Sequence, residues 1–285
     1  MAEDEGSSRH RERIYRHSLV VRITHWLNAA ILLVMLMSGL QIFNAHPALY
    51  WGEKSLFDTP WAAITAASAD NDAPRGVTTI SGHSFTTTSV LGVSSDVTGQ
   101  PQERAFPRWA TIPADQSLAT GRRWHFLFAW LLVINGLIYL GNGALTSHFS
   151  RDLAPTVRDL RHIPRSIWDH VRFRFPEGDE ARRYNVLQKL TYLVVVFIIL
   201  PALILAGLTM SPGIDTAFPW LLDLFGGRQS ARTIHFLCAF ALVLFTIVHL
   251  IEVLVSGVIN NMRSMITGRY DIERRTRDVS TLLQP

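Results

Sequence analysis

The chain has 285 residues, of which 48% are hydrophobic and 18% charged, and its formal net charge is +4. A mean hydropathy of +0.18 is too apolar for an ordinary soluble domain. The single cysteine, Cys238, excludes an intrachain disulfide, a C-x-x-C-H haem-attachment motif and a cysteine-ligated iron–sulfur cluster.

Four segments are long and apolar enough to cross about 30 Å of hydrocarbon. They are residues 23–43, 124–146, 187–210 and 231–257. The first is too long for the apolar core of a signal peptide, so we expect it to remain as a transmembrane helix. The sequence therefore predicts an all-α fold, a single membrane domain over residues 1–285 built as a four-helix transmembrane bundle.

The distribution of arginines predicts the orientation of this bundle. Arginines are concentrated in the N-terminal tail, in residues 147–186 and in the C-terminal tail, whereas the connection after the third segment has two acids, Asp215 and Asp223, and only one arginine, Arg228. By the positive-inside rule, both termini and the 147–186 segment are cytoplasmic. The basic charge is then a topology signal and indicates no nucleic-acid partner. Basic termini beside a lipid bilayer also suit anionic lipids.

The long connections differ in character. The 44–121 segment is rich in small and polar residues, and it is predicted to be a periplasmic loop or irregular hairpin. A loop of this length either is disordered or docks a periplasmic partner. Residues 155–175 place apolar side chains near helical spacing among arginines, which predicts an amphipathic helix on the membrane surface. Pro201 predicts a kink in the third span.

Histidines are the candidate functional residues. His235 and His249 lie fourteen residues apart in the fourth span. The second ring returns to within about 40° of the first, about 20 Å further along the helix. This arrangement can supply one axial ligand to each of two stacked haems. His25 and His125, at the starts of the first two spans, can supply the opposite ligands.

The predicted topology determines which histidines pair. His25 and His249 lie toward the cytoplasmic side, so we expect them to hold one haem. His125 and His235 lie near the periplasmic edge and are expected to hold the other. Histidines inside a membrane are costly and usually functional, which favours ligation over simple packing.

Three of the four spans begin with the pattern Arg-x-x-His, with arginines at Arg22, Arg122 and Arg232. Residues three apart are neighbours on a helix, so each arginine lies one turn nearer water than its histidine. A guanidinium binds carboxylates bidentately, which predicts that these arginines pair with haem propionates. Arginines also flank membrane spans for other reasons, but chance would then have to place an arginine three residues before a histidine at the start of three spans.

Two glycines and one acid complete the candidate site. Gly39 shares the face of His25 at the depth of the other haem, and Gly136 returns close to the face of His125. A missing side chain lets a flat macrocycle approach the backbone, although small residues also serve ordinary helix packing. Glu252, one turn after His249, is a candidate for passing protons to a bound quinone, or it extends to the membrane edge.

These motifs resemble the prokaryotic cytochrome b561 group, the b-type cytochrome subunits of nickel–iron hydrogenases, formate dehydrogenases and thiosulfate reductases. The resemblance rests on the run from Arg22 to Asn28, on the two later Arg-x-x-His patterns with His249, and on residues 260–268. It covers the four spans. The 44–121 segment is longer than in simpler members and is similar to the thiosulfate-reductase-like members, which are commonly paired with a periplasmic molybdopterin oxidoreductase.

The resemblance implies a bacterial inner-membrane subunit with two b haems that carries electrons between a periplasmic oxidoreductase and the quinone pool. Substrate conversion would then belong to the partner. One alternative is a stand-alone enzyme of the cytochrome b561 type, in which superoxide or another small reductant meets the outer haem and quinone is the acceptor. A haem-free transporter or anchor is disfavoured because membrane acids are sparse.

Overall fold

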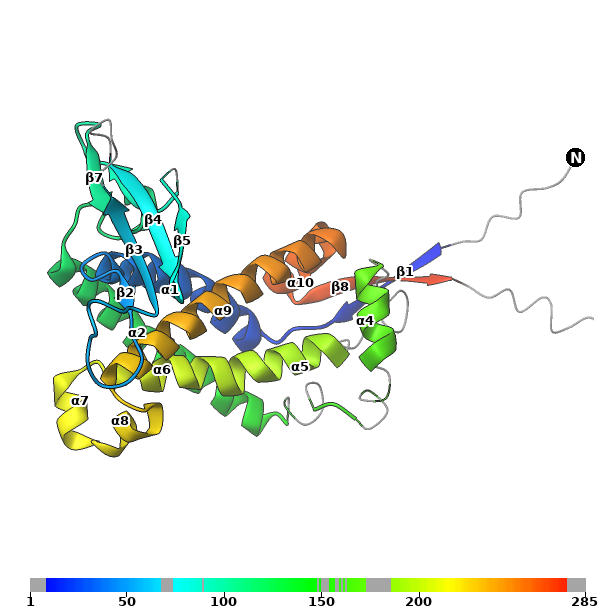
Figure 1. Cartoon of the computed structure of the whole chain (residues 1–285). Helices are drawn as coiled ribbons and strands as arrows, with labels where there is room; N and C mark the ends of the chain where they lie inside the picture. The colour runs from blue at the N-terminus through cyan, green and yellow to red at the C-terminus, as the bar shows by residue number, and fades with distance from the viewer. Residues whose placement is uncertain are drawn as a thin grey trace, which may run out of the picture. The chain divides into compact units, whose positions relative to one another are not determined.

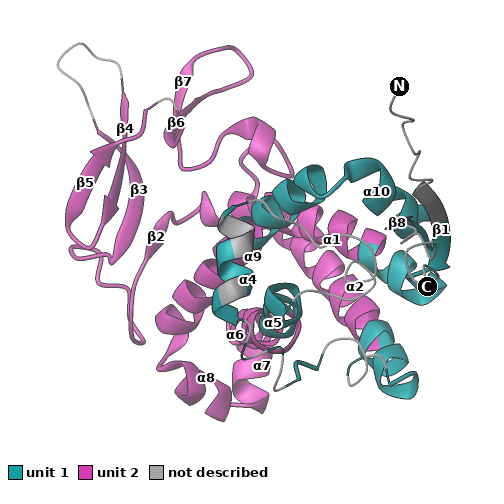
Figure 2. Ribbon diagram, turned by 90° about the vertical axis from the view of Figure 1, so that its right-hand side faces the viewer, with its two compact units in different colours: residues 1–25, 138–195, 244–285 teal, residues 26–137, 196–243 magenta. Residues whose placement is uncertain are grey.

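The structure is a computed structural model that describes residues 9–67, 74–88, 90–147, 149, 154–156, 159, 161, 163–172 and 186–275. The chain falls into two compact units, coloured separately in Figure 2. Unit 1 contains residues 1–25, 138–195 and 244–285, and unit 2 contains residues 26–137 and 196–243. Each unit combines segments that are far apart in the sequence.

Four helical segments have the length and apolarity to cross a membrane (Figure 1). They are α1 (Leu19–Phe43), α2 (Leu118–Leu145), the segment Val186–Leu208 and α9 (Arg228–Val255). Between 6% and 17% of the residues in their most apolar windows are buried, so most of the apolar side chains are available to lipid. A helix satisfies its backbone hydrogen bonds internally, as a hydrocarbon environment requires. The four predicted spans are confirmed.

The third span is not a uniform α-helix. It consists of α5 (Val186–Val194), the π-helical turn η4 (Val195–Ile199) and α6 (Leu200–Leu208). Pro201 lies in the first turn of α6, where it lacks the N–H that would bond to the carbonyl one turn earlier. A wider π turn directly before a proline relieves this mismatch and is a common cause of a helix kink.

The 44–121 segment is built largely from strands. A four-stranded antiparallel sheet has the order β2-β3-β4-β5, and β6 pairs with β7 in a separate ribbon. The strands are β2 (Ala48–Leu49), β3 (Ala62–Ala67), β4 (Arg75–Ile80), β5 (His83–Thr86), β6 (Gly92–Ser95) and β7 (Pro101–Arg104). The fold is mostly helical, but these strands correct the prediction that it is all-α, and the segment is more regular than the predicted loop or irregular hairpin. A short 3₁₀ turn, η1 (Arg108–Ala110), follows β7.

Apart from a β-leaning piece at 84–93, which overlaps β5 and β6, the sequence does not indicate these strands, because they carry little hydrophobic alternation. All four residues of β5 are exposed, and β3 is largely alanine. The informative signal was the Ser-Gly pair between β4 and β5. Ser81 and Gly82 have φ values of 49° and 81°, and a two-residue type I′ hairpin turn requires positive φ at both positions.

A local carboxylate closes the β6–β7 hairpin. Asp96 Oδ1 accepts hydrogen bonds from the Thr98 hydroxyl (2.7 Å), the Thr98 N–H (2.7 Å) and the Gln100 N–H (2.9 Å). These bonds, that from the Thr98 hydroxyl most strongly, hold the pKa of Asp96 below its usual value. The turn is thus fixed by side-chain chemistry rather than by burial.

The 44–121 segment shares a hydrophobic core with the spans of unit 2. Phe43, at the end of α1, packs with Leu49, Ile64 and Ala105 from the segment, and Phe236 of α9 packs against this cluster. The Phe43 and Phe236 ring centres are 4.8 Å apart. Because Phe236 directly follows His235, the segment is anchored beside that histidine.

A buried arginine adds a second anchor. Arg104 is only 2% exposed. Its guanidinium donates to Gln41 Oε1 (2.8 Å) on α1, to Thr111 Oγ1 (2.5 Å) and to the Ala114 carbonyl (2.6 Å). Burial, together with the nearby Arg108, lowers the pKa of Arg104, and the three acceptors offset the cost of burying its charge.

The N-terminus of α9 is capped by the same segment. The Gly52 carbonyl accepts hydrogen bonds from the N–H groups of Gln229 (3.0 Å) and Ser230 (3.1 Å). The Ser230 hydroxyl in turn accepts from the Gly52 N–H at 2.7 Å. Two of the otherwise unsatisfied donors of the first helical turn are thereby paired. Two short helices, α7 (Pro212–Ala217) and α8 (Trp220–Phe225), precede α9.

Unit 1 contains strands that were also not predicted. Strands β1 (Arg9–Tyr15) and β8 (Arg269–Arg275) form an antiparallel ribbon from the two basic tails. Helix α10 (Val258–Thr267) leads into β8. Helix α4 (Ile163–Val171) lies within the stretch expected to form an amphipathic helix, and its location on a membrane surface stays a prediction.

Candidate functional site: two histidine pairs

Four histidines form two pairs, one within each unit. In unit 1, the rings of His25 (α1) and His249 (α9) have centres 6.2 Å apart and planes 61° apart. In unit 2, the rings of His125 (α2) and His235 (α9) have centres 6.1 Å apart and planes 69° apart. The structure thus brings together the residues that the sequence analysis paired.

The ring separation in each pair fits two histidines that bind the same metal ion. A histidine nitrogen lies about 2 Å from a bound metal ion and the ring centre about 1.2 Å beyond it, so two rings on opposite sides of one ion have centres about 6.4 Å apart. Each pair can therefore supply two axial nitrogens to one iron.

Hydrogen bonds select the nitrogen that faces the partner ring in unit 2. His125 Nδ1 lies 3.1 Å from both the Met35 carbonyl and Ser38 Oγ on α1. His235 Nδ1 lies 2.8 Å from the Leu203 carbonyl on α6. A carbonyl can only accept, so each Nδ1 carries the proton and each Nε2 keeps its lone pair for a metal.

A glycine lies one turn after each of these carbonyls. A Cβ added at Gly39, four residues after Met35, would lie 3.3 Å from His125 Cε1. A Cβ added at Gly207, four residues after Leu203, would lie 3.1 Å from His235 Cε1. The glycines therefore let both rings approach a helix backbone closely enough to reach its carbonyl.

Aromatic packing orients the ring of His249 in unit 1. The Phe245 ring stacks on His249 with centres 5.8 Å apart and planes 19° apart. Tyr192 of α5 contacts Phe245 edge-on at 6.4 Å. This stack comes from one turn of α9 and limits rotation of the His249 side chain.

Arg22 and Arg122, two of the arginines predicted to bind propionates, make different contacts in the structure. Arg22 Nη1 donates to the Ile266 carbonyl on α10 at 2.5 Å, within unit 1. Arg122 is exposed, and its guanidinium carbon lies 5.5 Å from the centre of the Phe126 ring. A guanidinium has five N–H donors, so these contacts leave capacity for a carboxylate.

The third arginine, Arg232 of α9, contacts the 44–121 segment and the end of α1. Arg232 Nη2 donates to the His46 carbonyl, and its guanidinium lies 5.6 Å from the centre of the Phe43 ring. His46 itself stacks on Tyr50 at 5.6 Å. Burial and the charge of Arg232 lower the pKa of His46, which favours its neutral form.

Gly136 and Glu252 are the remaining predicted site residues. A Cβ added at Gly136 would meet no atom within 4 Å. Glu252 lies three residues after His249 on α9 and is half-buried, and its backbone carbonyl accepts from the Ser256 hydroxyl at 2.6 Å. Their assignments to haem packing and proton transfer stay predictions.

Sequence reasoning missed the contribution of the third span and of Ser38. No histidine lies on α6, so Leu203 and Gly207 gave no chemical signal in the sequence. Ser38 is fully buried and directly precedes Gly39. A pair of small residues inside an apolar span, here Ser38 and Gly39, indicates that another helix or side chain lies close to the backbone, and the sequence alone could have shown this.

Comparison with known proteins identifies the family. The model of the prokaryotic cytochrome b561 family matches residues 16–268. A protein of Azospira oryzae named "Putative protein-methionine-sulfoxide reductase subunit YedZ1" is 26% identical over 252 residues, which cover 88% of this chain and 96% of the relative. No solved structure matches the chain.

The family match covers most of the chain and confirms the resemblance drawn from the sequence motifs. With its four apolar helices, the protein is a multi-pass protein of the bacterial inner membrane, and the family implies b-type haem. The chain belongs to the prokaryotic cytochrome b561 family.

Proposed function

We propose that this protein is a di-haem electron-transfer subunit that connects a periplasmic oxidoreductase to the quinone pool. His25 and His249 would be the axial ligands of one haem b, and His125 and His235 those of the other. The observation that carries the proposal is the separation of the ring centres, 6.2 Å in one pair and 6.1 Å in the other. Both values fit one iron between two imidazoles.

A bound b haem supplies reversible one-electron chemistry. The chain supplies the environment that sets its potential. The carbonyls of Met35 and Leu203 accept from His125 and His235 and raise the basicity of these ligands. Arg22, Arg122 and Arg232 would bind the haem propionates through their remaining donors.

The first prediction concerns cofactor content. Full-length protein produced with ample haem should contain two b haems per chain, extractable with acidified acetone because the ligands are histidines and no covalent attachment motif exists. A pyridine haemochrome assay against protein concentration measures this ratio. A ratio of about one would contradict the four-ligand scheme and leave only one histidine pair as a site.

A second prediction tests the glycine contact in unit 2. Gly207→Ala places a Cβ about 3.1 Å from His235 Cε1, so the ring must move away from the Leu203 carbonyl. We expect about tenfold weaker retention of one haem and a higher midpoint potential for it, because its ligand becomes less basic. Redox titration and haem content measure both effects.

The matched control is Gly141→Ala on α2, where an added Cβ would meet no atom within 4 Å. This variant changes helix propensity to the same extent and should leave both potentials unchanged. Equal shifts in the two variants would mean that the Gly207 effect is general destabilisation and not a change at His235. A normal titration of Gly207→Ala would remove the proposed role.

The proposed partner is a periplasmic redox protein. The name of the Azospira oryzae relative describes a protein-methionine-sulfoxide reductase subunit, and we extend this assignment to a partner that reduces oxidised methionine and holds molybdopterin. The arginine distribution supports cytoplasmic termini and a periplasmic 44–121 segment. That segment is anchored beside His235 through Phe236, which supports electron exchange on this side.

Quinone is the proposed second redox partner. It would react near the His25–His249 pair, on the cytoplasmic side in the proposed topology. Glu252 lies one turn from His249 and is the candidate for moving protons to and from the quinone. Glu252→Gln removes the ionisable group, so it would slow quinone turnover while leaving the haem content intact.

A further inference from the structure

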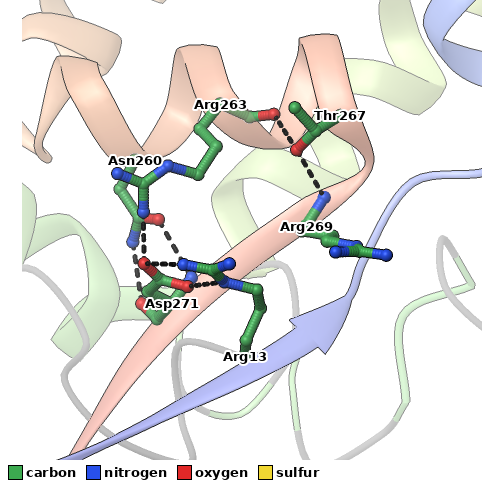
Figure 3. A network of polar contacts seen from close by, with 6 residues as sticks. All are labelled: Arg13, Asn260, Arg263, Thr267, Arg269 and Asp271. Carbon is green, nitrogen blue, oxygen red and sulfur yellow. Dashed lines mark hydrogen bonds and ion pairs between the residues drawn. The ribbon is translucent and has the colours of Figure 1, made fainter.

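We propose that a basic hollow at the end of α10 binds the phosphate group of an anionic phospholipid. The hollow has a volume of about 420 Å³ and is lined by Arg13, Arg263, Thr267 and Arg269. All four residues belong to unit 1, and Figure 3 shows them around the β1–β8 ribbon. The proposal is independent of haem ligation.

One carboxylate organises the hollow. Asp271 Oδ1 accepts from Arg13 Nε at 2.8 Å, and Asp271 Oδ2 accepts from Arg263 Nη1 (Figure 3). The Asp271 backbone exchanges two hydrogen bonds with the Asn260 amide, at 2.8 and 3.0 Å. This acid positions two of the three lining guanidinium groups, and the hollow keeps a net positive charge.

The third arginine that lines the hollow is Arg269, whose positive charge is available to a ligand. Arg269 is exposed, and the part of the chain that the structure describes gives its guanidinium no acidic partner. Its backbone N–H donates to Thr267 Oγ1 at 3.2 Å, which fixes its backbone beside the end of α10. The Thr267 hydroxyl itself donates to the Arg263 carbonyl at 2.8 Å, so the arginine side chains are the donors that suit the oxygens of a phosphate group.

The faces of α10 favour a lipid over a free anion. Its polar face, with Asn260, Arg263 and Thr267, is directed at the ribbon (Figure 3). Ile259, Met262 and Ile266 form an adjoining apolar face, and they are 74%, 37% and 62% exposed. A helix with one apolar and one basic face lies in the plane of the membrane interface.

The position of α10 in the chain agrees with this placement. Helix α9 ends at Val255, and Gly257, with φ of 103°, separates it from α10. A residue at positive φ allows an abrupt change of direction directly after a membrane span. Helix α10 thus begins at the membrane edge, and the hollow at its end lies at the level of lipid headgroups.

The test is lipid binding by the full-length protein after delipidation in a neutral detergent. Native mass spectrometry would count bound phosphatidylglycerol and phosphatidylcholine over a concentration series, with inorganic phosphate as a third ligand. We expect phosphatidylglycerol to bind most tightly. Removing one arginine from a lipid site weakens binding about fivefold, so Arg269→Ala should show a loss of this size. Arg269→Lys should retain most of the affinity.

The matched control is Arg75→Ala, which removes an exposed arginine from β4 and should leave phosphatidylglycerol binding unchanged. Far-ultraviolet circular dichroism and the haem spectrum check that Arg269→Ala remains folded. Equal affinity of wild-type protein and Arg269→Ala would overturn the proposal, as would an equal loss in Arg75→Ala. If inorganic phosphate alone bound with the same dependence on Arg269, the hollow would be a free-anion site and the lipid assignment would be wrong.

Discussion

Alanine at His25 and alanine at His249 should remove the same haem, whereas alanine at His125 or His235 should remove the other. Each haem in the proposed scheme needs two axial nitrogens, and loss of either one leaves a five-coordinate iron that binds weakly. The expected result is about half of the wild-type haem content in each variant. Reductive titration followed by visible spectroscopy would show which of two components is lost.

His83→Ala is the matched control for these variants. His83 lies in β5, where every residue is exposed, and belongs to neither pair. This substitution should preserve both spectral components. The scheme fails if His25→Ala and His235→Ala lose the same component while His249→Ala retains it, because the pairs would then be assigned wrongly.

The pairing could be read from the sequence because a helix has a fixed geometry. Fourteen residues return a side chain to nearly the same face, so His235 and His249 needed only a shared helix to serve two sites. The positive-inside rule then predicted that His25 lies at the depth of His249 and that His125 lies at the depth of His235. The structure gives both pairs nearly the same ring separation, although the haem ligation itself stays a proposal.

Other parts of the site could not be read from sequence periodicity. Contact of His235 with Leu203 and Gly207 depends on how two spans pack, and neither residue has reactive chemistry. The short strands of the 44–121 segment lack the alternation that identifies a half-buried sheet. The β1–β8 ribbon joins the two ends of the chain, and a pattern within either tail cannot reveal such a pairing.

The 44–121 segment suggests a specific site for the redox partner. Thr78 is opposite Phe85 and Ile80 is opposite His83 in the β4–β5 hairpin, so Ile80 and Phe85 lie on one face. Their exposed fractions are 45% and 55%. Exposed apolar side chains on an anchored sheet are typical of a protein interaction surface.

Aspartate at both Ile80 and Phe85 should slow electron exchange with the partner oxidoreductase tenfold or more, about the effect of losing an interface anchor. Both haem spectra should be unchanged, because the anchors of the segment at Arg104 and Phe236 are retained. Stopped-flow mixing of the reduced partner with oxidised protein would measure the rate.

Ser84→Asp adds a charge on the opposite face of the same hairpin and should leave the rate near that of the wild type. An unchanged rate in the double variant would exclude this face as the docking surface. Rapid reduction of quinone by superoxide with the purified protein alone would instead support a stand-alone enzyme, because electrons would then reach the haems without a protein partner.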